Sequence, residues 1–135
     1  MKIVLDTNVL ISGLLQPYGS PGQIVRTVSS GTLQLCHDSR ILSEYREVLL
    51  RPKFNFPRKD VDSLLEQIEF RGYPVSAEPL RISFPDPDDV IFLEVALSGR
   101  VPYLVTGNLK HFSEYKGKEV KILSPAAFLR VQALD

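Results

Sequence analysis

Acidic residues occur at three separate places in the chain, each beside an apolar stretch. Asp6 follows the apolar residues 3–5, Glu44 lies in an amphipathic segment, and three aspartates between 86 and 89 precede an apolar run. Carboxylate oxygens are the ligands that Mg²⁺ and other hard cations prefer. A cation held in this way activates water and neutralises the charge that develops during phosphodiester hydrolysis. If the fold brings these acids together, they could support such a reaction.

Helix capping is the alternative role for several of these side chains. Asp6 or Asn8 could cap a helix after the first strand, because both residue types accept hydrogen bonds from free backbone N–H groups. Asp86 as N-cap, with Pro87 at the first helical position, would begin another helix. Capping needs one or two carboxylates, however, and three within four residues repel one another unless water or a cation screens them. The excess favours a cation site.

The elements that must position these acids alternate between strands and helices. Residues 3–5 are apolar without alternation, which is typical of a strand covered on both faces in a parallel sheet. This order predicts an α/β fold with right-handed crossovers. The predicted strands are 3–5, 33–36, 73–77, 103–105 and 120–123, and the predicted helices are 9–15, 21–29, 39–50, 61–71, 90–97 and one from 125.

Polar residues follow two of the predicted strands. Asp6-Thr7-Asn8 ends the first strand and Thr106-Gly107-Asn108 ends the fourth. The carboxyl ends of parallel strands meet at one edge of the sheet, where ligands bind in open α/β folds. Asp6 and Asn108 should therefore face each other if their strands are neighbours. The aspartates at 86–89 reach the same edge only if the loop after the edge strand carries them across.

The helix predicted at 39–50 places its two glutamates differently. Its apolar stripe consists of Ile41, Leu42, Tyr45, Val48 and Leu49. At 100° per residue, Glu44 lies about 100° and Glu47 about 160° from the centre of this stripe. Glu47 is therefore predicted to face solvent, whereas Glu44 lies at the boundary of the buried face and can point into a crevice. Alternatively, Glu44 is a flank residue that pairs with a neighbouring arginine.

Composition limits the class of protein and its partners. The 135 residues fit one domain, with 44% hydrophobic and 24% charged residues, as in an ordinary globular protein. Sixteen basic and 16 acidic residues give no overall attraction to nucleic acid, so a polyanion must be held by a local patch or a metal ion. The single Cys36 excludes an internal disulfide. Without an export signal or an apolar run of roughly 18 residues, a cytoplasmic protein that does not span a membrane is expected.

Four stretches of the sequence resemble the PIN-domain family, and the resemblance extends over nearly the whole chain. These are IVLDTNVLIS, SEYREVL, DPDDVIFLEVAL and YLVTGNLKHF. The chain is most similar to stand-alone prokaryotic PIN proteins of toxin–antitoxin pairs. The resemblance implies one domain over 1–135 with a three-layer α/β/α fold around a central, mainly parallel five-stranded sheet. It also implies an Mg²⁺- or Mn²⁺-dependent endoribonuclease that cuts single-stranded RNA, an antitoxin partner that covers the cleft, and a homo-oligomer.

The resemblance also assigns the acids. The first-strand acid of the family matches Asp6, the mid-chain glutamate matches Glu44, and the acid at the helix start matches Asp89; these are the expected catalytic and metal-binding residues. Asp86 is an additional or alternative metal ligand. Asp88, which points elsewhere on the helix, is the weakest of the three neighbouring aspartates.

Polar residues beside these acids match the family less uniformly. Thr7, Asn8 and Thr106 match polar positions of the family, and the hydroxyl at Thr106 would orient water or a phosphate oxygen. Asn108 departs from the pattern, because many PIN nucleases have a second aspartate after Thr-Gly. An amide oxygen can accept from metal-bound water but carries no charge, so a one-metal site is expected.

Two residues after Asn108 are candidates for contacts with phosphate, and two other functions are compatible with parts of the sequence. Lys110 and His111 could contact phosphate, although a surface or packing role is favoured for His111. Asn108 leaves open a PIN-fold module that binds nucleic acid or protein with weak or no catalysis. A phosphoryl-transfer enzyme with Asp6 as nucleophile would need a second aspartate two residues later, where Asn8 stands, and is disfavoured.

Overall fold

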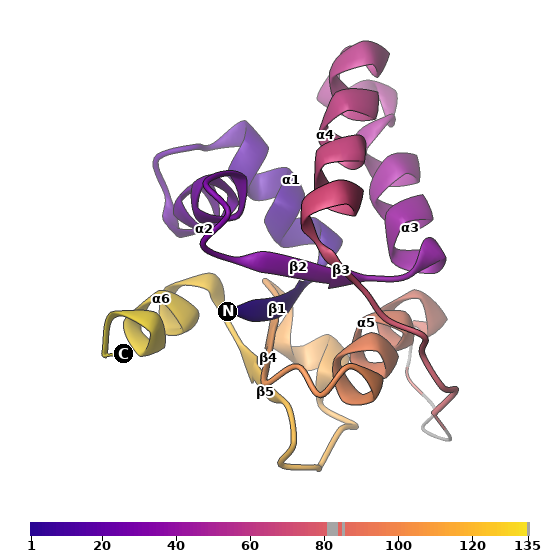
Figure 1. The fold of residues 1–135 in the computed structure, drawn as a ribbon, viewed down its shortest axis with the longest axis vertical. Helices are drawn as coiled ribbons and strands as arrows, with labels where there is room; N and C mark the ends of the chain where they lie inside the picture. The colour runs from indigo at the N-terminus through magenta and orange to yellow at the C-terminus, as the bar shows by residue number, and fades with distance from the viewer. Residues whose placement is uncertain (81–83, 85, 135) are drawn as a thin grey trace.

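A single parallel sheet forms the centre of the protein (Figure 1). The computed structural model describes residues 1–80, 84 and 86–134. Within this part of the chain, five strands pair in the order β3-β2-β1-β4-β5, and every neighbouring pair is parallel. The strands are β1 Lys2–Leu5, β2 Gln34–His37, β3 Tyr73–Pro74, β4 Tyr103–Val105 and β5 Lys121–Leu123. The sequence-based prediction of a five-stranded parallel sheet is confirmed.

Helices cover both faces of this sheet. In Figure 1, α1 to α4 lie on one side of the sheet and α5 lies on the other, while α6 packs beside α2. This is the expected three-layer α/β/α arrangement. The helices are α1 Thr7–Leu15, α2 Ser20–Ser29, α3 Ser39–Leu49, α4 Arg58–Arg71, α5 Pro87–Ser98 and α6 Pro125–Leu134, with short 3₁₀ turns η1 Pro52–Phe54 and η2 Leu109–Phe112. Among the described residues, no helix combines the length and apolarity that crossing a membrane requires.

The central strand is buried because its residues are apolar on both faces. Ile3, Val4 and Leu5 of β1 are fully buried. The register pairs Val4 with Leu104 of β4, and the Asp6 N–H continues this ladder to the Val105 carbonyl at 2.9 Å. Removing such aliphatic side chains from water is the main driving force for folding. Asp6 therefore emerges from the most protected strand of the sheet.

The two helices that carry the other acids form for the reasons predicted. In α3, Ile41, Tyr45 and Leu49 are buried at i, i+4 and i+8, and Asp38 caps the helix by accepting from the Ile41 N–H at 3.0 Å. In α5, the buried residues surround the helix, as its apolar sequence implies. They are Asp89, Phe92, Leu93, Glu94, Val95 and Ala96.

The segment between β3 and α5 returns along α5 toward the site. The Glu78 N–H donates to Ser98 Oγ at 2.9 Å, and the Leu80 N–H donates to Glu94 Oε2 at 2.7 Å. These contacts follow α5 from its C-terminal end toward its N-terminal end. The chain therefore crosses to the start of α5, as the sequence-based argument required. The edge strand β3, Tyr73–Pro74, is shorter than the predicted 73–77.

Candidate active site

Asp6 lies at the carboxyl end of β1, where the sheet gives way to α1. Only 5% of the residue is exposed. It occupies the N-cap position of α1, but its carboxylate makes no capping hydrogen bond to a described residue of that helix. Instead, Oδ2 accepts from Thr106 Oγ1 at 2.7 Å and from Asn8 Nδ2 at 3.4 Å. The carboxylate is thus held toward the neighbouring strand end rather than used as a cap.

The second polar strand end locks onto the first. Thr106 is fully buried, and its Oγ1 accepts from the Asn108 N–H at 3.0 Å while it donates to Asp6. The Gly107 N–H donates to Asn8 Oδ1 at 3.1 Å. The expectation that the ends of the first and fourth strands meet is therefore confirmed. The Asn108 residue itself is exposed.

Glu44 approaches Asp6 from α3. Its Oε2 accepts a hydrogen bond from Thr7 Oγ1, so the residue directly after Asp6 holds it. Burial raises the pKa of Glu44, with a further increase from the charge of Asp6, while the hydrogen bond from Thr7 lowers it. Glu44 is half-buried, and Glu47 on the same helix has 66% of its side chain exposed. Both positions agree with the helical geometry read from the sequence.

Asp89 reaches the same region from the first turn of α5. It is 8% exposed, and burial raises its pKa to about 6, with a further increase from the Asp6 charge that His111 opposes. His111 Nδ1 lies 3.2 Å from Asp89 Oδ2, but this oxygen accepts no hydrogen bond from the described residues. An unsatisfied buried oxygen of this kind is costly unless a cation or water meets it.

Asp86 and Asp88 are exposed on the surface, unlike the buried Asp6 and Asp89. The Asp86 carboxylate caps α5 by accepting from the Asp88 N–H at 2.9 Å, which confirms the capping alternative for this residue. Its charge nevertheless raises the pKa of both Asp6 and Asp89. Asp88 contributes to the raised pKa of Glu44 and lines an open groove with it. Lys110 is also exposed, in η2.

The buried acids offer carboxylate oxygens, which are the type of donor that a hard cation needs. Burial raises the pKa of Asp6, and the Thr106 hydrogen bond lowers it. Asp6, Glu44 and Asp89 therefore each carry a cost of ionisation, and the charge of Asp6 adds to this cost for the other two. Within the described part of the chain, however, no three acidic, histidine or cysteine side chains are already spaced to hold a metal ion. The side chains supply suitable oxygens without a closed cage.

Two contacts at this site were not expected from the sequence. His111, for which a surface or packing role was favoured, lies against Asp89. The buried Tyr45, expected only as part of the apolar stripe, donates through its hydroxyl to the Leu5 carbonyl at 2.5 Å and thereby ties α3 to the end of β1. A hydrogen bond from its hydroxyl could have been suspected, because a buried tyrosine hydroxyl needs a partner.

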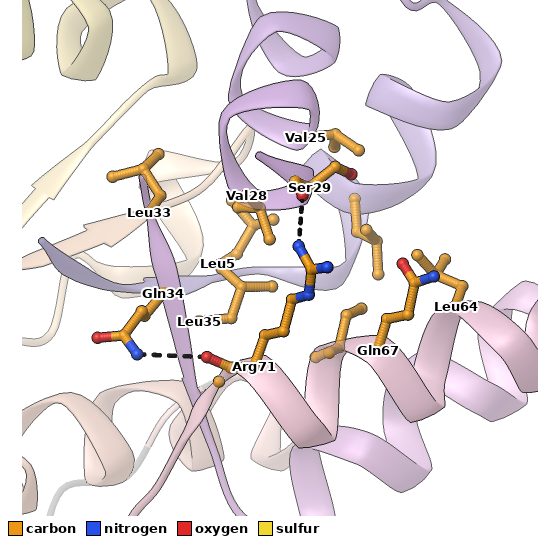
Figure 2. A pocket seen from close by; sticks show the side chains of 13 residues that line it. Leu5, Val25, Val28, Ser29, Leu33, Gln34, Leu35, Leu64, Gln67 and Arg71 are labelled. Atoms are coloured by element: carbon orange, nitrogen blue, oxygen red, sulfur yellow. Dashed lines mark hydrogen bonds between the residues drawn. The ribbon is translucent and has the colours of Figure 1, made fainter. Parts of the chain in front are cut away.

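A separate, mostly apolar pocket lies between α2, α4 and the strands β1 and β2 (Figure 2). Arg71 crosses it, and its Nη1 donates to the Ser29 carbonyl at 2.9 Å. Gln34 Nε2 donates to the Arg71 carbonyl at 3.3 Å on the same side. The described lining residues include no carboxylate, so this pocket offers nothing for the chemistry considered above.

Comparisons with known proteins agree with this architecture. The model of a PIN-domain family matches residues 2–110. The fold is similar to a chain in the crystal structure of VapBC2 from Rickettsia felis bound to a DNA fragment from their promoter, with a TM-score of 0.60 and 15% identity over 92% of this chain and 98% of that one. It is also similar to a chain in the structure of FitAB bound to an IR36 DNA fragment, with a TM-score of 0.59 and 19% identity over 93% and 95%. No curated protein matches the sequence.

Proposed function

From the premise that the chain belongs to the PIN-domain family, we propose that it is a metal-dependent endoribonuclease that hydrolyses single-stranded RNA. PIN domains are generally nucleases, which are hydrolases. The observation that carries the proposal is the convergence of Asp6, Glu44 and Asp89 from three different elements, each with a raised pKa. Buried acids whose charges oppose one another are typical of sites that bind a cation.

Each side chain has a distinct role in this proposal. Asp6 and Asp89 would hold Mg²⁺ or Mn²⁺, with Glu44 and Asp86 as further ligands. The ion would activate water and neutralise charge on the scissile phosphate. The hydrogen bond that Thr106 donates to Asp6 orients the carboxylate and favours its ionised form. These residues make a site for an anionic substrate in a chain of zero net charge, since the cation reverses the local sign.

The polar residues around the acids would align the substrate. Asn108 and Lys110 are exposed beside the site, where an amide and an ammonium can reach phosphate oxygens. Thr7 and Asn8 fix the shape of the site, because they bond to Glu44 and to the Gly107 N–H. We expect one bound ion, because Asn108 supplies no fourth negative charge.

A partner protein is the second part of the proposal. The fold neighbours come from the VapBC2 and FitAB complexes, which supports a role as the toxin of a toxin–antitoxin pair. An antitoxin would cover the acidic site and block access of RNA. We further propose that residues 1–135 act as one domain, in a cytoplasmic homo-oligomer; light scattering tests the oligomer.

Cleavage of a labelled single-stranded RNA tests the enzymatic proposal. The wild type should cut the RNA in the presence of Mn²⁺ or Mg²⁺, and EDTA should abolish cleavage. Asp6→Asn or Asp89→Asn should lower the cleavage rate by about a hundredfold or more. Glu44→Gln should also lower the rate, and Glu47→Gln is its matched control, because both residues lie on α3 and Glu47 is exposed. Undiminished cleavage by Asp6→Asn, or cleavage in EDTA, would contradict the proposed mechanism.

A binding module without catalysis is the second candidate. Asn108 lacks the charge of the usual second aspartate, and the described acids do not form a closed metal cage. This candidate predicts that the wild type binds RNA on a filter but cuts none of it with any divalent ion. Binding together with cleavage excludes it.

A further inference from the structure

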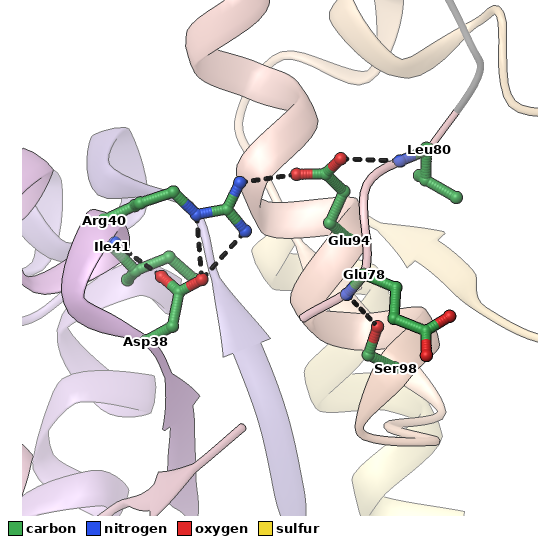
Figure 3. A network of polar contacts seen from close by, with 7 residues as sticks. All are labelled: Asp38, Arg40, Ile41, Glu78, Leu80, Glu94 and Ser98. Atoms are coloured by element: carbon green, nitrogen blue, oxygen red, sulfur yellow. Dashed lines mark hydrogen bonds and ion pairs between the residues drawn. The ribbon is translucent and has the colours of Figure 1, made fainter. Parts of the chain in front are cut away.

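Glu94 is a buried carboxylate that the proposed site does not use. It lies on α5 with 6% of its side chain exposed. Apart from Glu94 and Asp89, the buried residues of this helix are apolar. Burying a carboxylate is costly unless a positive partner and hydrogen bonds compensate it. Arg40 Nη1 lies 2.6 Å from Glu94 Oε1, and the Leu80 N–H donates to Oε2 at 2.7 Å (Figure 3).

Arg40 is itself held from the other side. Its Nε donates to Asp38 Oδ2 at 2.9 Å, and its Nη2 lies 2.8 Å from the same oxygen. Asp38 in turn caps α3 through the Ile41 N–H. The guanidinium therefore joins the N-terminal cap of α3 to the middle of α5, with both of its edges engaged (Figure 3). A planar guanidinium bonded in this way has little freedom to rotate.

The pair lies about one helical turn from Glu44 along α3 and about one and a half turns from Asp89 along α5. Arg40 precedes Glu44 by four residues on α3, and Glu94 follows Asp89 by five residues on α5. At 1.5 Å per residue, these are about 6 and 7.5 Å along the helix axes. The two helices also meet through the tilted ring pair of Tyr45 and Phe92, with centroids 6.4 Å apart. Apolar contacts of this kind are not directional, whereas the ion pair fixes one alignment of the helices.

We propose that Arg40 and Glu94 are a positioning pair that sets the separation of Glu44 and Asp89, and through it the affinity of the site for a divalent cation. The inference rests on the proposed function, which places a cation between these acids. The bond from the Leu80 N–H joins the segment that ends there to the same carboxylate. Small displacements of metal-binding groups lower affinity strongly, so a pair that contacts no ion can still determine how well one binds.

A double variant separates positioning from simple loss of stability. Arg40→Met alone leaves Glu94 buried without a positive partner, whereas Arg40→Met with Glu94→Gln removes the pair without a stranded charge. Arg46 and Asp62 provide the matched control, because they form a 2.6 Å ion pair between α3 and α4 with 40% and 43% of their side chains exposed. The control is Arg46→Met with Asp62→Asn.

The measurement is Mn²⁺ affinity by electron paramagnetic resonance, alongside kcat and KM for RNA cleavage. We expect the double variant to bind Mn²⁺ about tenfold more weakly or worse, with a lower kcat and an almost unchanged KM, and the control to match the wild type. Arg40→Lys, which keeps the charge but not the two-edged geometry, should fall between them and serves if the double variant does not fold. Wild-type Mn²⁺ affinity in a folded double variant would overturn the inference alone. A wild type that neither binds Mn²⁺ nor cuts RNA would overturn the proposed function as well.

Discussion

Thr106 Oγ1 donates a 2.7 Å hydrogen bond to Asp6 Oδ2 and joins two strand ends that lie 100 residues apart in the sequence. Burial raises the pKa of Asp6, and this hydrogen bond is the largest effect that lowers it. The hydroxyl therefore favours the charged form of the carboxylate, which is the form that can bind a cation. The same hydroxyl accepts the Asn108 N–H, so its orientation is fixed.

Replacement of Thr106 by valine should shift the pH dependence of cleavage. Without the hydrogen bond, the pKa of Asp6 rises further, so the acidic limb of the kcat/KM profile should move to higher pH. A hydrogen bond to a charged group contributes ~1.5 kcal/mol or more, which corresponds to about a tenfold lower activity at a given pH on that acidic limb. Thr106→Ser keeps the hydroxyl and is the control. Identical profiles for the valine and serine variants would show that the bond does not act on Asp6.

Neutralising Asp89 should stabilise the protein when no metal is present. Burial, with the charge of Asp6, raises the pKa of Asp89 to about 6 from the ordinary 3.8. Between these values the folded protein binds more protons than the unfolded chain, so its stability falls as pH rises and the whole penalty applies above pH 6. Asp89→Asn removes that penalty. Its melting temperature in EDTA should exceed that of the wild type at pH 7.5 but not at pH 4.

The exposed Asp60, in the first turn of α4, provides the control for this experiment. Asp60→Asn should not reproduce the gain at pH 7.5. Addition of Mn²⁺ should then stabilise the wild type and not Asp89→Asn, because a bound ion stabilises only a protein that binds it. A variant less stable than the wild type at pH 7.5 in EDTA would show that the Asp89 charge is compensated by groups other than a cation.

Gly72 should be among the glycines that tolerate no side chain. A Cβ there would lie 2.4 Å from the Leu35 carbonyl oxygen and 2.5 Å from that of Ile68, and backbone atoms of a strand and a helix cannot move aside easily. Gly72→Ala should lower the free energy of unfolding by about 2 kcal/mol or more in urea denaturation. At Gly19 the nearest atom would be 3.8 Å away, so Gly19→Ala should change stability little. Equal effects at the two positions would contradict the steric explanation.

The parts that were predictable from sequence are those set by local pattern. The apolar run at 3–5 predicted a central parallel strand, and helical periodicity placed Glu44 at the boundary of α3 and Glu47 in solvent. Capping rules predicted Asp86 at the start of α5. The family resemblance, rather than periodicity, selected Asp89 among three adjacent aspartates.

The parts that were not predictable depend on how helices cross. Arg40 and Glu94 are 54 residues apart, and neither local sequence predicts that the two side chains pair. One signal was present in the sequence. The run VIFLEVAL is apolar nearly all round and therefore buried, and a glutamate within it needs a positively charged or hydrogen-bonding partner. Similarly, the contact of His111 with Asp89 depends on the path of η2, which has no periodic pattern to predict it.

The strand order has a consequence for the order of synthesis. The ribosome makes β1 first, yet β4, its partner on one side, and Thr106, which orients its terminal carboxylate, follow about a hundred residues later. A nascent polypeptide therefore carries Asp6 without the groups that complete its surroundings. In the proposed nuclease, hydrolysis at this centre would therefore begin only after most of the chain has been translated.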